Sequence, residues 1–155
     1  MRQMTLQSTV SWVLFSLLFQ TGLAAQETKR ATETMAIIAG AGFPQDRMTV
    51  KELKAIYLGE TQLVKDLWIH PIDQRENRPI RKSFLEQVVN LTRDRYIDHW
   101  NQRLFRYGGF SPLLKSNSLE VIEAVREQEG AIGYVWLEEA RNEQGIKILL
   151  TLDNP

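Results

Sequence analysis

The segment Ile56–Phe84 reads IYLGETQLVKDLWIHPIDQRENRPIRKSF. It begins with Ile-Tyr-Leu-Gly, where the glycine is typical of the left-handed residue that ends a helix. The run from Leu67 to Ile72 predicts a strand, and a loop rich in arginine leads from it to Pro79. Proline suits the first position of a helix, because its missing N–H would have been unpaired there anyway. This order of helix, strand and basic loop favours anion binding, since the first amides of a helix lack partners within it.

The rest of the sequence predicts further helices and strands in alternation. Thr49-Val-Lys-Glu52 is a capping box, in which the Thr oxygen and the Glu carboxylate bind free amides at a helix start. Asn117–Glu120 offers another, for a helix that ends at Gly130. Strands that alternate with helices favour an α/β domain, with a mixed sheet flanked by helices. The other predicted elements are helices at Pro79–Leu91 and Arg93–Phe105, and strands at Met35–Ala39, Ala131–Trp136 and Ile146–Leu152.

The first 25 residues differ in composition from the rest of the chain. They contain one basic residue, Arg2, then the apolar run Val10–Phe19 and small residues up to Ala25. This three-part pattern predicts a secretory signal and a periplasmic protein, because the apolar run is shorter than the about 20 residues of a spanning helix. An uncleaved membrane anchor is the alternative. Residues 26–34 are then a polar, flexible lead-in, and residues 35–155 form one domain.

Composition narrows the range of functions. The chain has 19 Lys and Arg against 19 Asp and Glu, and this balance gives no argument for nucleic acid or for an anionic membrane as a partner. It has no cysteine, which excludes disulfides, thiolate catalysis and cysteine zinc sites. His70 and His99 lack the paired spacing of a zinc site, and Ser83 and Ser111 lack the glycines of a nucleophile elbow. We therefore expect no metal, no cofactor and no enzyme activity.

Two groups of residues are candidates for ligand binding. The first is the loop with Arg75, Arg78 and Arg81, whose guanidinium groups suit phosphate, sulfate or carboxylate. The second is Gly40-Ala41-Gly42, which follows the first strand, where backbone amides can be exposed. The alternative is that the arginines are solvated or pair with Asp73, Glu76 and Glu86, and that the glycines form a plain turn. Trp68, Trp100 and Trp136 fall on apolar faces and are predicted to lie in the core. The candidate ligand-binding residues are Arg75, Asn77, Arg78, Arg81, Ser83, Gly40, Ala41 and Gly42.

Several short motifs, in order, resemble the phosphate-binding proteins of bacterial phosphate ABC transporters, in a small single-lobe form. The resemblance covers about residues 35–152, nearly all of the chain after the predicted signal. It implies one lobe of a type II periplasmic-binding-protein-like fold, with phosphate or another oxyanion as ligand and a membrane transporter as partner. The matching motifs are LKAIYLGE (53–60), IHPID (69–73), RENRPIRKSF (75–84), HW (99–100) with LFRYGGFSP (104–112), and GAIGYV (130–135).

The chain departs from this family at the residues that grip phosphate. Arg78-Pro79-Ile80 stands where the family has Ser-Gly-Thr, so two hydroxyl donors are missing. The resemblance then implies that Arg75 and Arg81 supply charge, that amides after Pro79 donate, and that Gly40–Gly42 lines the opposite wall. A ligand-free interaction module, which docks an envelope protein through the loop Gly108–Pro112, is the alternative.

Overall fold

The structure, a computed structural model, describes residues 34–153. The predicted signal, residues 1–25, and the lead-in up to residue 33 lie outside the described residues, so both stay predictions. The strands are β1 (Thr34–Gly40), β2 (Leu63–Val64), β3 (Leu67–Trp68), β4 (His70–Gln74), β5 (Leu113–Lys115), β6 (Ala131–Trp136) and β7 (Ile146–Asp153). The helices are α2 (Val50–Tyr57), α3 (Pro79–Phe84), the π-helical turn η1 (Leu85–Val89), α4 (Arg93–Tyr107), α5 (Ser118–Glu127) and α6 (Leu137–Ala140).

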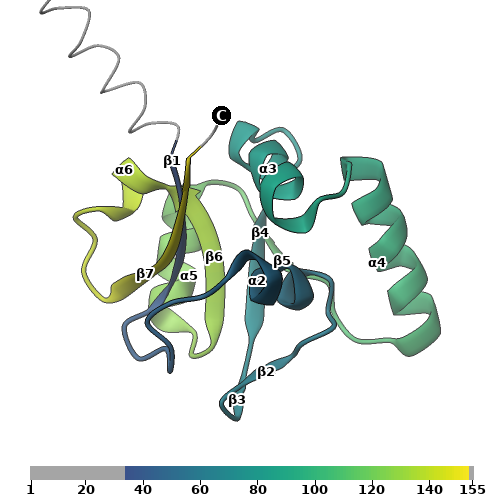
Figure 1. Cartoon of the computed structure of the whole chain (residues 1–155), viewed down its shortest axis with the longest axis horizontal. Coiled ribbons are helices and arrows are strands. Elements are labelled where there is room, and N and C mark those ends of the chain that lie inside the picture. The colour runs from purple at the N-terminus through teal and green to yellow at the C-terminus, as the bar shows by residue number, and fades with distance from the viewer. Residues whose placement is uncertain (1–33, 154–155) are drawn as a thin grey trace, which may run out of the picture.

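Five strands of the described chain form one mixed sheet in the order β5-β4-β6-β1-β7 (Figure 1). Strand β4 pairs in parallel with both β5 and β6, whereas β1 pairs antiparallel with β6 and β7. A parallel pair needs a crossover connection, and α3, η1 and α4 supply it between β4 and β5. The mixed sheet predicted from the sequence is confirmed.

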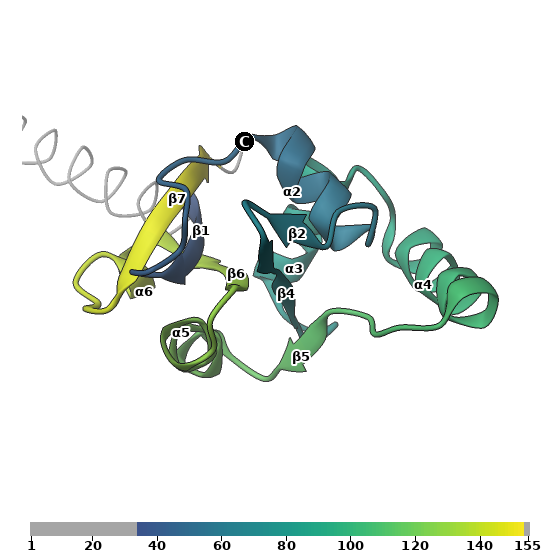
Figure 2. The same ribbon diagram turned by 90° about the horizontal axis from the view of Figure 1, so that it is seen from below.

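Helices cover both faces of the sheet, because side chains of a buried strand alternate between its two sides. On β1, Ala36 and Ile38 pack in the cluster of α5, while Met35, Ile37 and Ala39 pack with α2, α3 and η1. Figure 2 shows α5 on one side of the sheet and α2 and α3 on the other. The sheet is therefore the middle layer of a three-layer α/β/α domain.

The strand predicted at Leu67–Ile72 is wrong in its bounds. Lys65 and Asp66 have positive φ, 47° and 68°, and make the tight turn of a β2–β3 hairpin. The strand of the main sheet therefore begins only at His70. Trp68 lies on the hairpin and is exposed, so its predicted place in the core is also wrong, whereas Trp100 is buried.

The helix predicted from Pro79 to Leu91 is interrupted. It changes from α to π geometry at Leu85 and ends at Asn90, which is left-handed with φ 57°. Helix α4 extends to Tyr107, two residues beyond its predicted end. The short elements β5 and α6 were not predicted, since three or four residues carry too little periodicity to be recognised.

Candidate functional site

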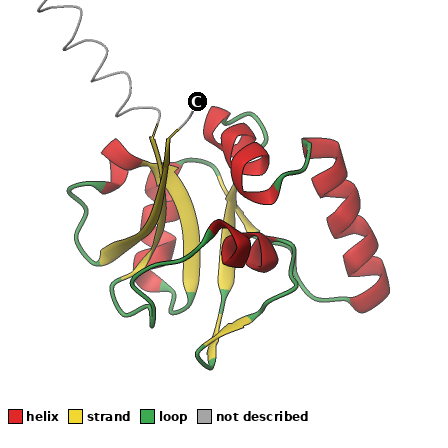
Figure 3. Ribbon diagram, viewed as in Figure 1, coloured by secondary structure: helices red, strands yellow, loops and turns green. Residues whose placement is uncertain are grey.

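The arginine loop lies at the carboxyl ends of the parallel strands. It leaves β4 after Gln74 and enters α3, where Arg78 is the N-cap and Pro79 the first residue, as predicted. Strands β4, β5 and β6 all point toward this edge of the sheet (Figure 3). Ligands of open α/β sheets bind outside the carboxyl ends of strands, and the loop is therefore in the right position for a site.

Arg81 is buried and pairs with a buried carboxylate, Asp73 at the end of β4. Its Nε and its terminal nitrogen each lie 3.0 Å from Asp73 Oδ2. The carboxylate also accepts the backbone N–H of Gln74, at 2.8 Å, and the hydroxyl of Tyr134. Of the alternatives left open by the sequence, pairing with Asp73 is the correct one for Arg81.

Tyr134 holds this ion pair from the neighbouring strand. Burial, and next the charge of Asp73, raise the pKa of Tyr134 well above its usual value, so the phenol stays neutral and donates. Its ring stacks on Phe84 with a centroid distance of 4.0 Å, and Phe84 contacts Tyr57 edge-on. Sequence reasoning missed Tyr134, because only the pairing of β4 with β6 brings it to the loop.

Arg78 differs from Arg81 in its environment. As the N-cap of α3 it forms no side-chain capping bond. Its Nε is buried, and no hydrogen-bond acceptor of the described residues lies within reach. A buried donor without an acceptor is costly, particularly in a charged group. This Nε is covered by protein atoms, but Arg78 as a residue is half-buried and no carboxylate of the described residues pairs with it, so its charge is not neutralised.

The other candidates of the loop are more open. Arg75 and Asn77 are exposed, and Ser83 is half-buried on α3. Glu76 pairs with Arg93 at the start of α4. The loop thus brings together Arg75, Asn77 and Arg78 beside the Arg81–Asp73 pair, without a carboxylate paired to Arg75 or Arg78 among the described residues.

Gly40–Gly42 does not share this site. Ala39 lies opposite Ile132, and Ile132 lies opposite Pro71 near the start of β4. The glycine turn is therefore at the other end of the sheet from the arginine loop, and the expectation that it forms the opposite wall is wrong. A Cβ on Gly40 would lie 2.6 Å from the carbonyl oxygen of Val125, so close packing against α5 accounts for this glycine.

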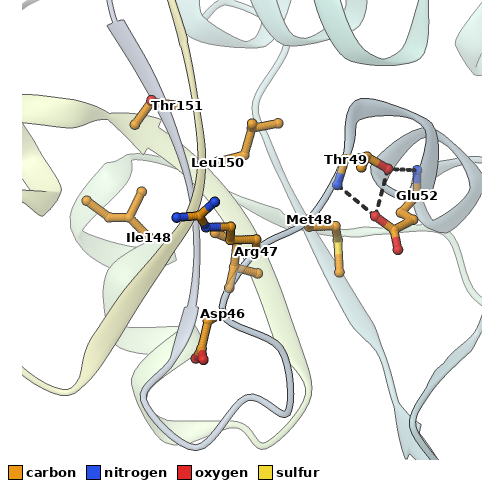
Figure 4. A pocket seen from close by; sticks show the side chains of 9 residues that line it. Asp46, Arg47, Met48, Thr49, Glu52, Ile148, Leu150 and Thr151 are labelled. Carbon is orange, nitrogen blue, oxygen red and sulfur yellow. Dashed lines mark hydrogen bonds between the residues drawn. The ribbon is translucent and has the colours of Figure 1, made fainter.

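A second hollow lies beside the edge strand β7, with a volume of about 480 Å³ (Figure 4). Three of its polar side chains have partners within the protein. The carboxylate of Glu52 accepts the N–H and the hydroxyl of Thr49, each at 2.7 Å, and Asp46 pairs with Lys147 at 2.7 Å. Arg47 also lines this hollow, and no carboxylate of the described residues pairs with it.

The described residues contain no cluster of three or more His, Asp or Glu side chains that could hold a metal ion. Within the same range, no helix is both long and apolar enough to cross a membrane.

Comparison with solved structures identifies the fold. An ABC-type phosphate transport receptor from Vibrio cholerae matches 74% of this chain with 18% identity and a TM-score of 0.58. A putative phosphate ABC transporter substrate-binding protein from Clostridium perfringens, with bound phosphate, matches the same share with 18% identity and a TM-score of 0.60. The fold matches part of the fold of these phosphate transport receptors and substrate-binding proteins. PstS from Borrelia burgdorferi also has this fold, with 20% identity over 80% of the chain and a TM-score of 0.59.

The match to these periplasmic binding proteins is partial. The chain spans about half the length of the structures, covering 44%, 43% and 52% of them. Their names describe receptors and binding proteins rather than enzymes. No protein-family model and no curated protein sequence matches the chain.

Proposed function

We propose that this protein binds a small oxyanion, with phosphate the first candidate, at the loop formed by residues 75–81. The observation that carries the proposal is Arg78, whose buried Nε has no acceptor among the described residues. The Nε itself is covered by protein, but the residue is half-buried, and an oxyanion at its accessible side would supply the negative charge that no described carboxylate gives it. The fold shared with phosphate-binding proteins supports the choice of phosphate.

The roles of the arginines differ from those expected from the sequence. Arg78 and Arg75 supply charge to the ligand, and Asn77 supplies an uncharged polar group. Arg81 has a positioning role, because its guanidinium is held by Asp73 beneath the loop. Ser83 is a neighbour of this site on α3, and Gly40, Ala41 and Gly42 have no part in it.

One lobe leaves a ligand more exposed to water than two lobes that close on it. Fewer hydrogen bonds form and desolvation is incomplete, so we expect weaker binding than in a two-lobed receptor. The predicted signal extends the proposal to a periplasmic protein that hands its ligand to a membrane transporter.

Thermal unfolding with phosphate, sulfate and other oxyanions at fixed ionic strength tests the proposal. A ligand at a hundred times its Kd adds about 2.7 kcal/mol and raises the Tm by several degrees. We expect Arg78→Gln to weaken binding at least tenfold. Lys82→Gln is the matched control, because Lys82 is an exposed cation of the same helix whose closest approach to Glu86 is 3.9 Å.

Three outcomes are distinguishable. A shift that Arg78→Gln removes and Lys82→Gln keeps supports the site. Equal shifts in both variants would contradict this site while leaving anion binding in place. No shift of the Tm with any oxyanion would favour the second candidate function, a ligand-free interaction module of the cell envelope. The ion pair of Arg81 with Asp73 also favours this candidate, because it removes one arginine from ligand binding.

A further inference from the structure

Exposed aromatic side chains gather where α4 ends and the chain runs to β5. Phe105, Tyr107 and Phe110 are 91%, 75% and 96% exposed, and Leu113 and Leu114 that follow are more than half exposed. Single exposed apolar residues are ordinary, but five of them within residues 105–114 indicate a contact surface. Figure 2 shows this part of the chain at the far end of the molecule from β7.

The backbone presents these side chains rather than folding them inward. Gly108 and Gly109 have φ of 67° and 95°, a conformation that favours glycine, and nothing lies near either one. Phe110 and Leu113 line a hollow of about 540 Å³ together with Trp68 on β3. Trp68 is 57% exposed, so the apolar surface continues onto the β2–β3 hairpin. We call Trp68 and residues 105–115 the aromatic face.

The segment of chain that forms most of this face is positively charged, although the whole chain is balanced. No acidic residue occurs between Asp98 and Glu120, whereas Arg103, Arg106 and Lys115 lie in that interval. The Arg103 guanidinium lies 5.7 Å from the centre of the Tyr107 ring and donates to the carbonyl of Gly59. Arg106 is exposed in the last turn of α4.

We propose that the aromatic face docks on an anionic lipid surface. Aromatic side chains favour the interface between lipid and water, and cations beside them are attracted to anionic headgroups. Charge argues against a second copy as the occupant, because two-fold pairing would bring the basic residues of both copies together. Trp68 lies at the other end of β4 from the arginine loop, whereas Lys115 lies beside that loop, since its carbonyl accepts the N–H of Arg75 at 3.1 Å.

A site-specific fluorophore tests the proposal in the full chain. The protein has no cysteine, so Ser111→Cys carries a single environment-sensitive label beside Phe110, and Asn142→Cys carries the same label on an exposed turn away from the face. With vesicles of phosphatidylcholine and phosphatidylglycerol, we expect a blue shift and quenching by spin-labelled lipid at position 111 only. Vesicles of phosphatidylcholine alone should give a much smaller response.

Two sets of substitutions separate the contribution of the aromatic side chains to vesicle binding from that of the basic side chains. Phe105→Ser with Phe110→Ser, and separately Arg106→Glu, should each lower vesicle affinity at least tenfold, because one basic residue near an anionic surface contributes roughly fivefold and the reversal changes the charge by two. Ile148→Ser on β7 is the control and should bind like the parent. The two phenylalanines are almost fully exposed, so their loss should leave the Tm unchanged.

Several results would overturn the proposal. If the fluorescence of the label at position 111 does not change with anionic vesicles, the proposal is wrong. This conclusion holds even if the chain binds the vesicles through the predicted N-terminal signal segment. A response that survives both sets of substitutions would also contradict it. A change at position 111 that depends on protein concentration without vesicles would assign the face to a second copy instead.

Discussion

Arg78 and Arg81 lie three residues apart but have different roles, because their surroundings differ. Arg81 reaches Asp73 with two nitrogens and is neutralised in the interior. Arg78, three residues earlier, has a buried Nε without an acceptor. The identical residue type is thus structural in one place and available to a ligand in the other. Environment, not residue type, determines the role.

Replacing Arg81 with Ala should destabilise the protein by about 3–5 kcal/mol, because Asp73 would remain as an uncompensated buried charge. Urea unfolding followed by circular dichroism measures this. Lys82→Ala is the control and should cost less than about 1 kcal/mol, since Lys82 is exposed. Equal stability of the Arg81 variant and the parent would show that the pair does not support the fold.

At the scale of the element, local hydrogen bonds fix where helices begin. The Thr49 oxygen accepts the N–H of Glu52, and the Glu52 carboxylate accepts the N–H of Thr49 at 2.7 Å. This reciprocal bonding satisfies free amides at the start of α2. Helix α2 in turn carries Tyr57, whose hydroxyl donates to the carbonyls of Ile72 on β4 and Ile132 on β6. The cap therefore helps to hold β4 and β6, the strands that lead to and support the arginine loop.

Thr49→Ala should lower the free energy of unfolding by about 1 kcal/mol, and Thr49→Ser should retain most of it. The Thr49 hydroxyl is the largest cause of the lowered pKa of Glu52, followed by its backbone N–H. Because the pKa of Glu52 is lower in the folded state, its ionised carboxylate stabilises the fold at pH values above the ordinary pKa of 4.5. This stabilisation is lost as the pH falls through the lowered pKa.

The difference in the free energy of unfolding between the parent and Glu52→Gln should therefore be present at neutral pH and shrink in acid. Urea titrations across this range measure it. A difference that stays constant down to acid pH would contradict the assignment of the cap.

At the scale of the whole molecule, packing is uneven. Strand β1 lies in the middle layer and is buried from Met35 to Ala39. Helix α4 has fifteen residues, of which only Tyr96 and Trp100 are buried. Regions with little buried apolar surface open at lower free energy than the core. We therefore expect α4 to open locally at a lower free energy than β1.

Amide hydrogen exchange should show this difference directly. We expect the amides of α4 to exchange by local opening, with protection at least tenfold lower than that of β1. Mass spectrometry of peptides covering residues 93–107 and 34–40 measures it. Equal protection of the two segments would show that α4 opens only with the whole domain.

Much of this architecture could be predicted from the sequence because its causes are local. The caps at Thr49 and Arg78, the periodicity of α5 and the apolar runs of β1 and β6 depend on residues a few positions apart. The β2–β3 hairpin escaped prediction because Lys65 and Asp66 lack the glycine that usually marks positive φ.

The arginine loop itself was predictable, but the partners of its residues were not. Asp73 and Tyr134 are 61 residues apart and meet only because β4 and β6 pair in parallel. The antiparallel pairing of β1 with β6 places Gly40–Gly42 at the opposite end of the sheet, away from the arginines. The sequence by itself determined the α/β class, the helix starts and the basic loop, since short-range sterics and hydrogen bonds specify them. Only the tertiary structure decided which arginine is neutralised and which aromatic residues face solvent, because strand order and burial depend on contacts between distant segments.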